Sequence, residues 1–148
     1  MNRRDLAHSI VLLFLLSSIG CRDSGPDSNS TQLQNILWTL QSFETIGGIT
    51  DTIADGRTYS ILFVSDTITR VRADCNECTG SYHASAASMG AHVSIGNLSC
   101  TKVYCGPSSL DVQFLNALSA ATDYSLQGDL LRLFYNERQR VLNLRRGF

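Results

Sequence analysis

Apolar and polar residues alternate in several short stretches of the chain, the pattern of half-buried β-strands. Before Cys100, these stretches cover residues 36–43, 59–64, 68–73, 81–84 and 92–95. In the first of them, Trp38, Leu40 and Ser42 fall on one face, and Gly47-Gly48 breaks the pattern. The second and third predict a hairpin around the polar turn Ser65-Asp66-Thr67.

The spacing of the apolar residues changes after Pro107. The residues at i, i+4, i+7, i+8 and i+11 are Leu110, Phe114, Ala117, Leu118 and Ala121. This spacing predicts one buried face of a helix of about twelve residues. Ser108 or Ser109 is expected to cap the helix, and Asp111 lies in its first turn, where negative charge is favourable.

Alternation resumes after the predicted helix. Residues 124–126 and 130–135 flank the tight-turn sequence Gln127-Gly128-Asp129, and residues 141–144 predict a final strand. The chain is therefore expected to form roughly seven to eight strands and one helix. Short strands joined by brief loops favour a small antiparallel, barrel-like sheet with the helix over one opening, so the predicted fold class is α+β, mostly β.

The N-terminal region has the layout of an export signal. Arg3 and Arg4 precede an apolar run over residues 10–16, and small residues lead from there to Cys21. The run is apolar on every face, which argues against an amphipathic helix of the domain itself. We expect residues 1–20 to be a signal peptide, residues 21–35 a polar, flexible tether, and residues 36–146 the folded domain.

Composition narrows the class of protein. The chain has 148 residues, of which 43% are apolar, with 12 basic and 13 acidic side chains and a formal net charge of −1. This length suits a single domain, and the charge excludes a generally basic nucleic-acid binder. We expect a monomer that binds neither nucleic acid nor a cofactor.

Four cysteines follow Cys21: Cys75, Cys78, Cys100 and Cys105. An exported chain enters an oxidising compartment, where an even set is interpreted first as two disulfides, and three pairings are open. The C-x-x-C spacing of the first two also fits half of a zinc site, but the second pair has four residues between its cysteines. A redox site is disfavoured because the acidic neighbours Asp74 and Glu77 oppose a thiolate. No metal is therefore expected.

No catalytic arrangement is evident in the predicted mature chain. Its two histidines, His83 and His92, lie in strand patterns without a nucleophile elbow or a metalloprotease motif. The C-terminal hairpin is locally basic, with only Glu137 to oppose its arginines. Its candidate surface for an anionic partner or lipid headgroups is formed by Arg132, Arg138, Arg140 and Arg145, and the alternative is a solvated face that protects sheet edges.

Two resemblances sharpen this interpretation. Ser18-Ile19-Gly20-Cys21 resembles the lipobox of bacterial lipoproteins, which implies lipidation of Cys21 and a membrane anchor. Arg22 after that cysteine implies the outer membrane rather than the inner one. Lipidation would also explain the odd number of cysteines.

The second resemblance covers nearly all of the predicted domain. Its residues, in order, are Trp38-Thr39-Leu40, Cys75-Asn76, Gly80-Ser81-Tyr82, Thr101 before Cys105, Phe114, Leu118, Tyr124, Gly128-Asp129-Leu130 and Leu133. This series resembles the META domain family of HslJ-like envelope proteins. The resemblance implies a compact β-rich barrel with one helix, and it favours the nested pairing of Cys75 with Cys105 and Cys78 with Cys100.

Three functional hypotheses follow. The first is a non-enzymatic, lipid-anchored envelope module that supports stress tolerance or binds another envelope component, as the META resemblance implies. The second is a lipoprotein that inhibits a lysozyme-like or other extracytoplasmic enzyme through an exposed loop. The third is a carrier of a small apolar ligand in a hollow barrel.

Overall fold

The computed structural model describes residues 30–54, 56–87 and 90–147. Nine strands form one antiparallel sheet in the described part of the chain. Their bounds are β1 Leu37–Thr45, β2 Thr50–Thr52, β3 Tyr59–Phe63, β4 Ile68–Ala73, β5 Asn76–Ala87, β6 Gly90–Cys100, β7 Ala121–Gln127, β8 Leu130–Tyr135 and β9 Arg140–Arg146. The helices are α1 Ser30–Leu33 and α2 Asp111–Ser119.

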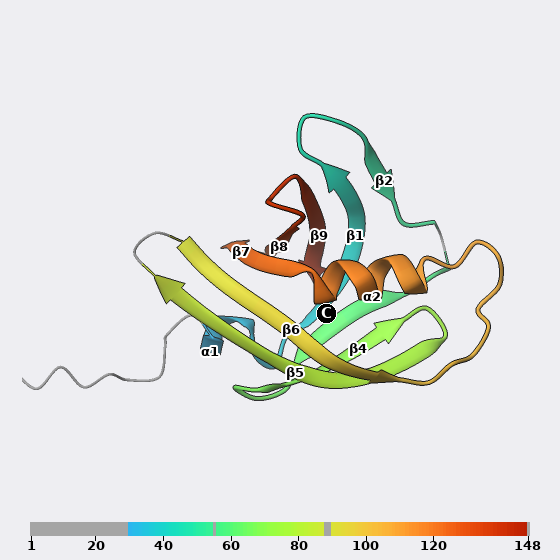
Figure 1. The fold of residues 1–148 in the computed structure, drawn as a ribbon, viewed down its shortest axis with the longest axis horizontal. Coiled ribbons are helices and arrows are strands. Elements are labelled where there is room, and N and C mark those ends of the chain that lie inside the picture. Colours follow the sequence, from blue (N-terminus) through green and yellow to red (C-terminus); the bar gives the residue numbers. More distant parts are fainter. Residues whose placement is uncertain (1–29, 55, 88–89, 148) are drawn as a thin grey trace, which may run out of the picture.

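The sheet closes on itself. Each strand from β3 to β9 pairs with the next, and β9 returns to pair with β1, from Trp38↔Arg146 to Thr45↔Arg140. β3 and β2 take successive parts of the other edge of β1, so β2 is an addition to an otherwise closed barrel. Figure 1 shows α2 lying across the barrel and the long β5–β6 hairpin crossing below it. The predicted fold class is confirmed.

The core follows the strand alternation except at a register shift in β1. Trp38, Leu40 and Phe43 of β1 belong to the core, and the shift lies between Leu40 and Ser42. The expectation that Ser42 shares the face of Trp38 and Leu40 is therefore wrong, because the shift gives that place to Phe43. Across the barrel, α2 buries Phe114, Ala117 and Leu118, and the Phe114 ring meets the ring of Tyr59 edge-on at 5.6 Å. Fully buried aromatic and aliphatic side chains therefore fill the space between the sheet and the helix.

Several elements differ from expectation. The two short strands expected at residues 81–84 and 92–95 are parts of the much longer β5 and β6. Small residues weaken the alternation there, whereas the cross-strand ladder continues from Cys78↔Cys100 to Ala87↔Gly90. The exposed three-residue β2 and the four-residue α1 have no apolar pattern and were not expected.

The helix is also shorter than its pattern. It ends at Ser119, and Ala121, the last residue of the helical spacing, begins β7 opposite Tyr135. The expected serine cap is wrong because Leu110 is the N-cap residue and has no capping side chain. Ser109 lies one residue before the N-cap position, and its Oγ accepts a hydrogen bond of 3.3 Å from the Asp111 amide.

Buried contacts begin before Ile36, the residue at which the sequence places the start of the folded domain. Leu33 is fully buried, and its carbonyl oxygen accepts a hydrogen bond from Trp38 Nε1 at 3.1 Å. The predicted signal peptide, Cys21 and most of the predicted tether lie outside the described residues. Within the described ranges, no helix has the length and apolar character needed to span a membrane.

Candidate functional site

Two disulfides hold one end of the barrel. Cys75–Cys105 joins the β4–β5 turn to the irregular segment that connects β6 with α2, and Cys78–Cys100 joins directly opposed residues of β5 and β6. The Cα atoms are 5.6 and 4.0 Å apart, respectively. This is the nested pairing that the family resemblance favoured. We call residues 101–110 the pinned loop, because the two bridges hold its base and its middle.

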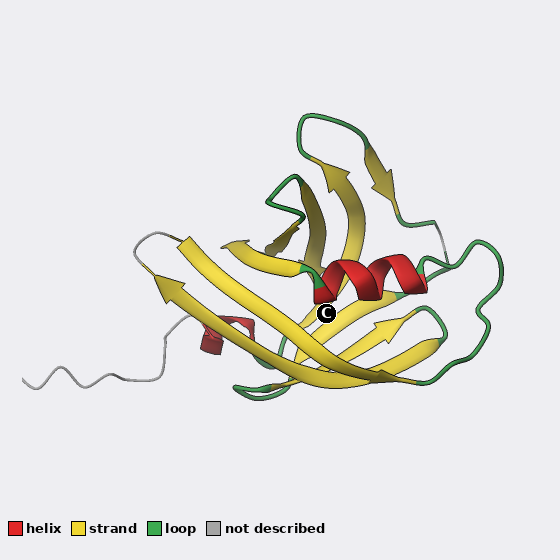
Figure 2. Ribbon diagram, in the orientation of Figure 1, coloured by secondary structure: helices red, strands yellow, loops and turns green. Residues whose placement is uncertain are grey.

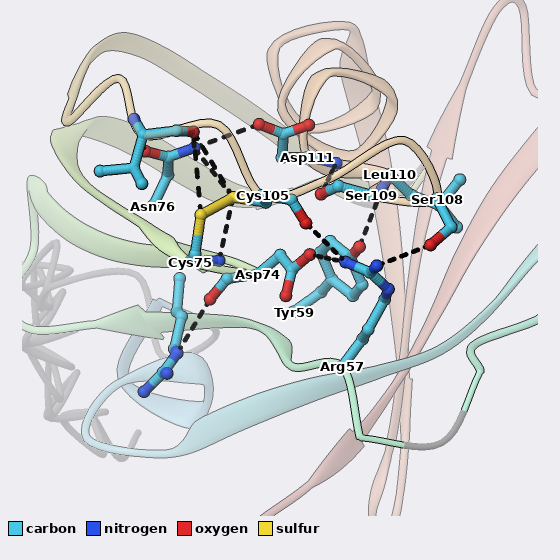
Figure 3. Close-up of polar contacts among 12 residues, drawn as sticks. Arg57, Tyr59, Asp74, Cys75, Asn76, Cys105, Ser108, Ser109, Leu110 and Asp111 are labelled. Carbon is cyan, nitrogen blue, oxygen red and sulfur yellow. Dashed lines mark hydrogen bonds and ion pairs between the residues drawn. A yellow bond between two sulfur atoms is a disulfide. The ribbon is translucent and has the colours of Figure 1, made fainter.

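Figure 3 shows one group of polar contacts around Asn76 and another around Arg57. Asn76 is only 4% exposed, yet its side chain is well supplied with partners. Its Nδ2 donates to the Val103 carbonyl at 3.0 Å and to Asp111 Oδ2 at 3.1 Å. Its Oδ1 accepts from the Val103 amide at 2.8 Å and from Thr101 Oγ1 at 3.0 Å. One buried amide thus holds the pinned loop and the first turn of α2 together.

Arg57 reaches the same loop from the segment before β3 (Figure 3). Its guanidinium pairs with Asp74, donates to the Cys105 carbonyl at 3.3 Å and donates to Ser108 Oγ at 2.6 Å. Asp74 lies in the left-handed region with φ 58°, which an aspartate tolerates, at the tight turn that leads into β5. The end of the loop is fixed separately, because the Leu110 amide donates to Tyr59 Oη at 2.8 Å.

The outer residues of the pinned loop remain open to solvent. Tyr104 is 82% exposed and Val103 is 57% exposed. Gly106 has φ 92°, which glycine adopts without strain, and it turns the chain back toward Arg57. In Figure 2 this green segment extends outward between β6 and α2. The arrangement presents an aromatic and an aliphatic side chain on a backbone that is held at several points.

The histidines lie away from this loop network. His83 and His92 are exposed on β5 and β6, and His92 Nδ1 lies 3.1 Å from Asp123 Oδ1. In the described ranges, no three His, Cys, Asp or Glu side chains gather as a metal-binding group. The zinc interpretation of the cysteines is overturned because all four are joined in disulfides.

The four arginines of the predicted binding surface have different surroundings in the structure. Arg132 pairs with Glu44 at 3.2 Å, and Arg138 pairs with Asp123 at 3.4 Å. Both guanidinium groups also lie over the Phe134 ring. Glu44 and Asp123 lie outside the hairpin sequence, so a count of acidic residues within the hairpin, which finds only Glu137, does not include these two partners.

The remaining two arginines of that set lie elsewhere. Arg140 lines a groove beside α2, whereas Arg145 is exposed on β9. The four residues therefore do not share one set of surroundings, and their role in binding stays a prediction.

The residues of the pinned loop were only partly expected. Asn76 and Thr101 belonged to the family series, and the structure shows that they hydrogen-bond to each other. Arg57 and the exposed Tyr104 were missed. No local signal identifies Arg57, because its contact with Ser108 spans 51 residues.

A closed antiparallel barrel with one packed helix and a disulfide-held loop defines a small β-barrel module. The META domain family model matches residues 31–147. The chain therefore belongs to the META domain family. None of the curated proteins matches the sequence.

Solved structures share the fold. An NMR structure of a protein from Burkholderia xenovorans has a TM-score of 0.64 at 14% identity, covering 99% of each chain. The crystal structure of a DUF4847 family protein from Bacteroides vulgatus has a TM-score of 0.57 at 15% identity, covering 79% of this chain and 96% of that protein. A further NMR structure has a TM-score of 0.56 at 18% identity, covering 78% and 92%.

Proposed function

We propose that this META domain protein is a non-enzymatic binding module of the cell envelope, anchored through a lipid on Cys21. Its pinned loop contacts another envelope component and thereby supports tolerance of envelope stress. The observation that carries the proposal is the combination of a backbone held by two disulfides, Asn76 and Arg57 with the exposed side chains of Val103 and Tyr104.

Preorganisation is the physical reason. Binding costs free energy when a loop must be ordered, so a loop that is already ordered retains more of its contact energy as affinity. Tyrosine is also enriched among the residues that dominate binding energy, since it combines a large apolar ring with a polar hydroxyl. An exposed Tyr104 on a fixed backbone meets both conditions.

The anchor rests on the sequence alone. The basic start, the apolar run and the Ser18-Ile19-Gly20-Cys21 resemblance to a lipobox support export and lipidation, with the outer membrane as the expected location. Cys21→Ala is expected to move the protein from the membrane fraction to the soluble fraction after cell lysis. A variant that stays in the membrane fraction would remove the anchor from the proposal.

Site-specific photocrosslinking tests the binding surface. A photoreactive phenylalanine analogue replaces Tyr104 in the full-length, anchored protein, and the matched control carries the same analogue at the exposed Arg70 of β4. We expect a discrete crosslinked product only with the analogue at Tyr104, and mass spectrometry then identifies the partner. Identical products from both positions, or none from either, would refute the pinned loop as the contact surface.

An enzyme-inhibitor role is the second candidate, and the same loop favours it. A rigid loop with a protruding side chain fits an enzyme cleft with little ordering cost. Micromolar protein should then inhibit a lysozyme-like enzyme, and Tyr104→Asp should abolish inhibition. Full enzyme activity at that concentration counts against this role. The carrier hypothesis has no such support, because Trp38, Phe43, Phe63 and other side chains fill the barrel interior.

A further inference from the structure

A groove of about 590 Å³ runs beside α2, where the helix passes the adjoining ends of β8 and β9. Its walls include Gln113, Asn116 and Ala120 of the helical side and Tyr135, Asn136 and Arg140 of the strand side. From this groove, we propose that the protein binds the C-terminal carboxylate of a peptide with small apolar side chains. The groove begins at Ser109 and Leu110, the end of the pinned loop, but it does not include Tyr104, and the inference goes beyond the proposed function.

Arg140 supplies the charge. It is the one charged side chain among the described residues that line the groove. Its Nε is buried and has no hydrogen-bond partner within the described residues, and its guanidinium carbon lies 5.8 Å from the centre of the Tyr135 ring. A guanidinium offers a planar fork of donors that matches a carboxylate, and it carries its positive charge at any pH that the protein meets.

Three other arginines of the hairpin already have an acidic partner, and Arg145 is exposed and does not line the groove. Arg132, Arg138 and Arg146 each have a carboxylate within 3.4 Å, from Glu44, Asp123 and Asp129 respectively. No acidic side chain lines the groove at Arg140 among the described residues. The local charge is therefore positive and uncompensated, which selects an anionic ligand.

The carboxamide side chains of the groove are the reason to propose a peptide rather than a simple anion. The side chains of Gln113, Asn116 and Asn136 are exposed along the groove, and each has both a donor and an acceptor. A peptide bond also carries one donor and one acceptor, so it can pair with such side chains. A simple anion such as phosphate would use Arg140 and leave these groups solvated.

Small and aliphatic residues complete the groove. Leu110, Ala117 and Ala120 line it, and Val112 at its edge is 65% exposed. Such a wall accommodates a methyl or another short apolar side chain close to the carboxylate. Charge, amide groups and small apolar surface together match a peptide C-terminus better than they match a phosphate or a purely apolar ligand.

Arg140 could instead serve only the helix, since it lies near the last turn of α2, which has no basic residue of its own. A cation near a helix C-terminus stabilises the helix. That role would lower thermal stability on substitution without creating any preference between ligands. The preference for a carboxylate over its amide is therefore the decisive readout.

The test uses the intact protein and a matched pair of probes: N-acetyl-Ala-Ala-Ala as the free acid and as the C-terminal carboxamide. NMR titration follows the side-chain amide signals of Gln113, Asn116 and Asn136. We expect the acid to shift these signals and to bind roughly tenfold or more tightly than the carboxamide, because one charge-assisted interaction is lost. Equal binding of the two probes, or no shift at millimolar acid, would overturn the proposal.

Variants locate the effect. Arg140→Gln should bring the acid down to the affinity of the carboxamide, while Arg70→Gln on β4, which is exposed and does not line the groove, should leave both affinities unchanged. Ala120→Phe, at an exposed edge of the groove, should block both probes even if Arg140→Gln is poorly folded. Retained acid preference in a folded Arg140→Gln protein would refute the assignment. The Arg140→Gln protein with the photoreactive analogue at Tyr104 should still give the crosslinked product, because Tyr104 does not line the groove. Failure of the groove proposal and failure of the proposed function therefore give different results.

Discussion

Asn76→Ala tests whether one side chain holds the pinned loop. The substitution removes the two hydrogen bonds to the Val103 backbone, at 2.8 and 3.0 Å, and those to Thr101 and Asp111, at 3.0 and 3.1 Å. It leaves both disulfides in place. Any loss of stability therefore reports the amide contacts rather than the covalent closure of the loop.

The magnitude follows from the number and surroundings of these contacts. An intramolecular hydrogen bond contributes about 0.5–1.5 kcal/mol net, and the range rises when a buried partner is left unpaired. Val103 and Thr101 are exposed enough for water to replace part of what is lost. We therefore expect Asn76→Ala to lower the free energy of unfolding by about 2–3 kcal/mol, near the low end of four such bonds.

Chemical denaturation under non-reducing conditions measures this loss, and hydrogen exchange of the Val103 amide measures the local effect. Asn116→Ala is the matched control, because its side chain is exposed and makes no hydrogen bond within the described residues. We expect the control to change stability little and the Val103 amide to exchange faster only in Asn76→Ala. A loss below about 1 kcal/mol with unchanged exchange at Val103 would refute the reasoning.

Asn76→Asp sharpens the same test. It keeps the size of the side chain but replaces the donating Nδ2 with a carboxylate oxygen beside the Val103 carbonyl and Asp111. Like charges and lost donors both oppose folding, so the loss should exceed that of Asn76→Ala at neutral pH. A fully stable Asn76→Asp protein would show that Nδ2 is not the donor on which the loop depends.

Three further perturbations test other parts of the structure. Replacing Cys75 and Cys105 together by alanine should lower the free energy of unfolding by about 2–3 kcal/mol. The Cys78–Cys100 bridge that remains already closes 22 of the 30 residues, so only part of the loop-closure entropy is released. No loss in non-reducing denaturation would contradict this. Gly80→Ala places a Cβ 2.7 Å from a carbonyl oxygen of β6 and should cost about 1–3 kcal/mol, whereas Gly96→Ala, with open space, should be tolerated; equal melting temperatures would contradict this. Burial raises the pKa of the Tyr82 phenol, so its contribution to stability is complete at neutral pH and decreases above about pH 10. Between neutral pH and a pH above about 10, the free energy of unfolding should decrease less in Tyr82→Phe than in the unsubstituted protein. The same decrease in both proteins would contradict this.

The elements with strong local patterns were predictable. The hairpin of β3 and β4, the hairpin of β7 and β8, and the strands β1 and β9 follow from alternation and turn residues. Side-chain alternation is a local consequence of strand geometry, so it is visible in a single sequence. The three exposed residues of β2 have no buried face and leave no such pattern.

The loop network was beyond local reasoning for a different reason. Arg57 meets Ser108 because strand pairing places the start of β3 beside the β4–β5 turn, and the Cys75–Cys105 disulfide ties that turn to the segment before α2. Likewise, the acidic partner of Arg132 is Glu44, 88 residues away. Contacts over such separations depend on the register of several strands, and a residue's identity does not encode them.

The contacts of the pinned loop are better explained by the loop's shape than by the barrel's stability. The barrel core is made of side chains from the strands, from α2 and from Leu33 of α1, and neither Val103 nor Tyr104 belongs to it. Stability alone would be served by a short polar connection, because exposed apolar groups contribute nothing to burial. Two bridges, a buried amide and a guanidinium instead fix the backbone beside two exposed apolar side chains. Such an arrangement is favourable when those side chains bury their surface against a partner, so loss of the Asn76 contacts should weaken the proposed contact at Tyr104 as well as folding.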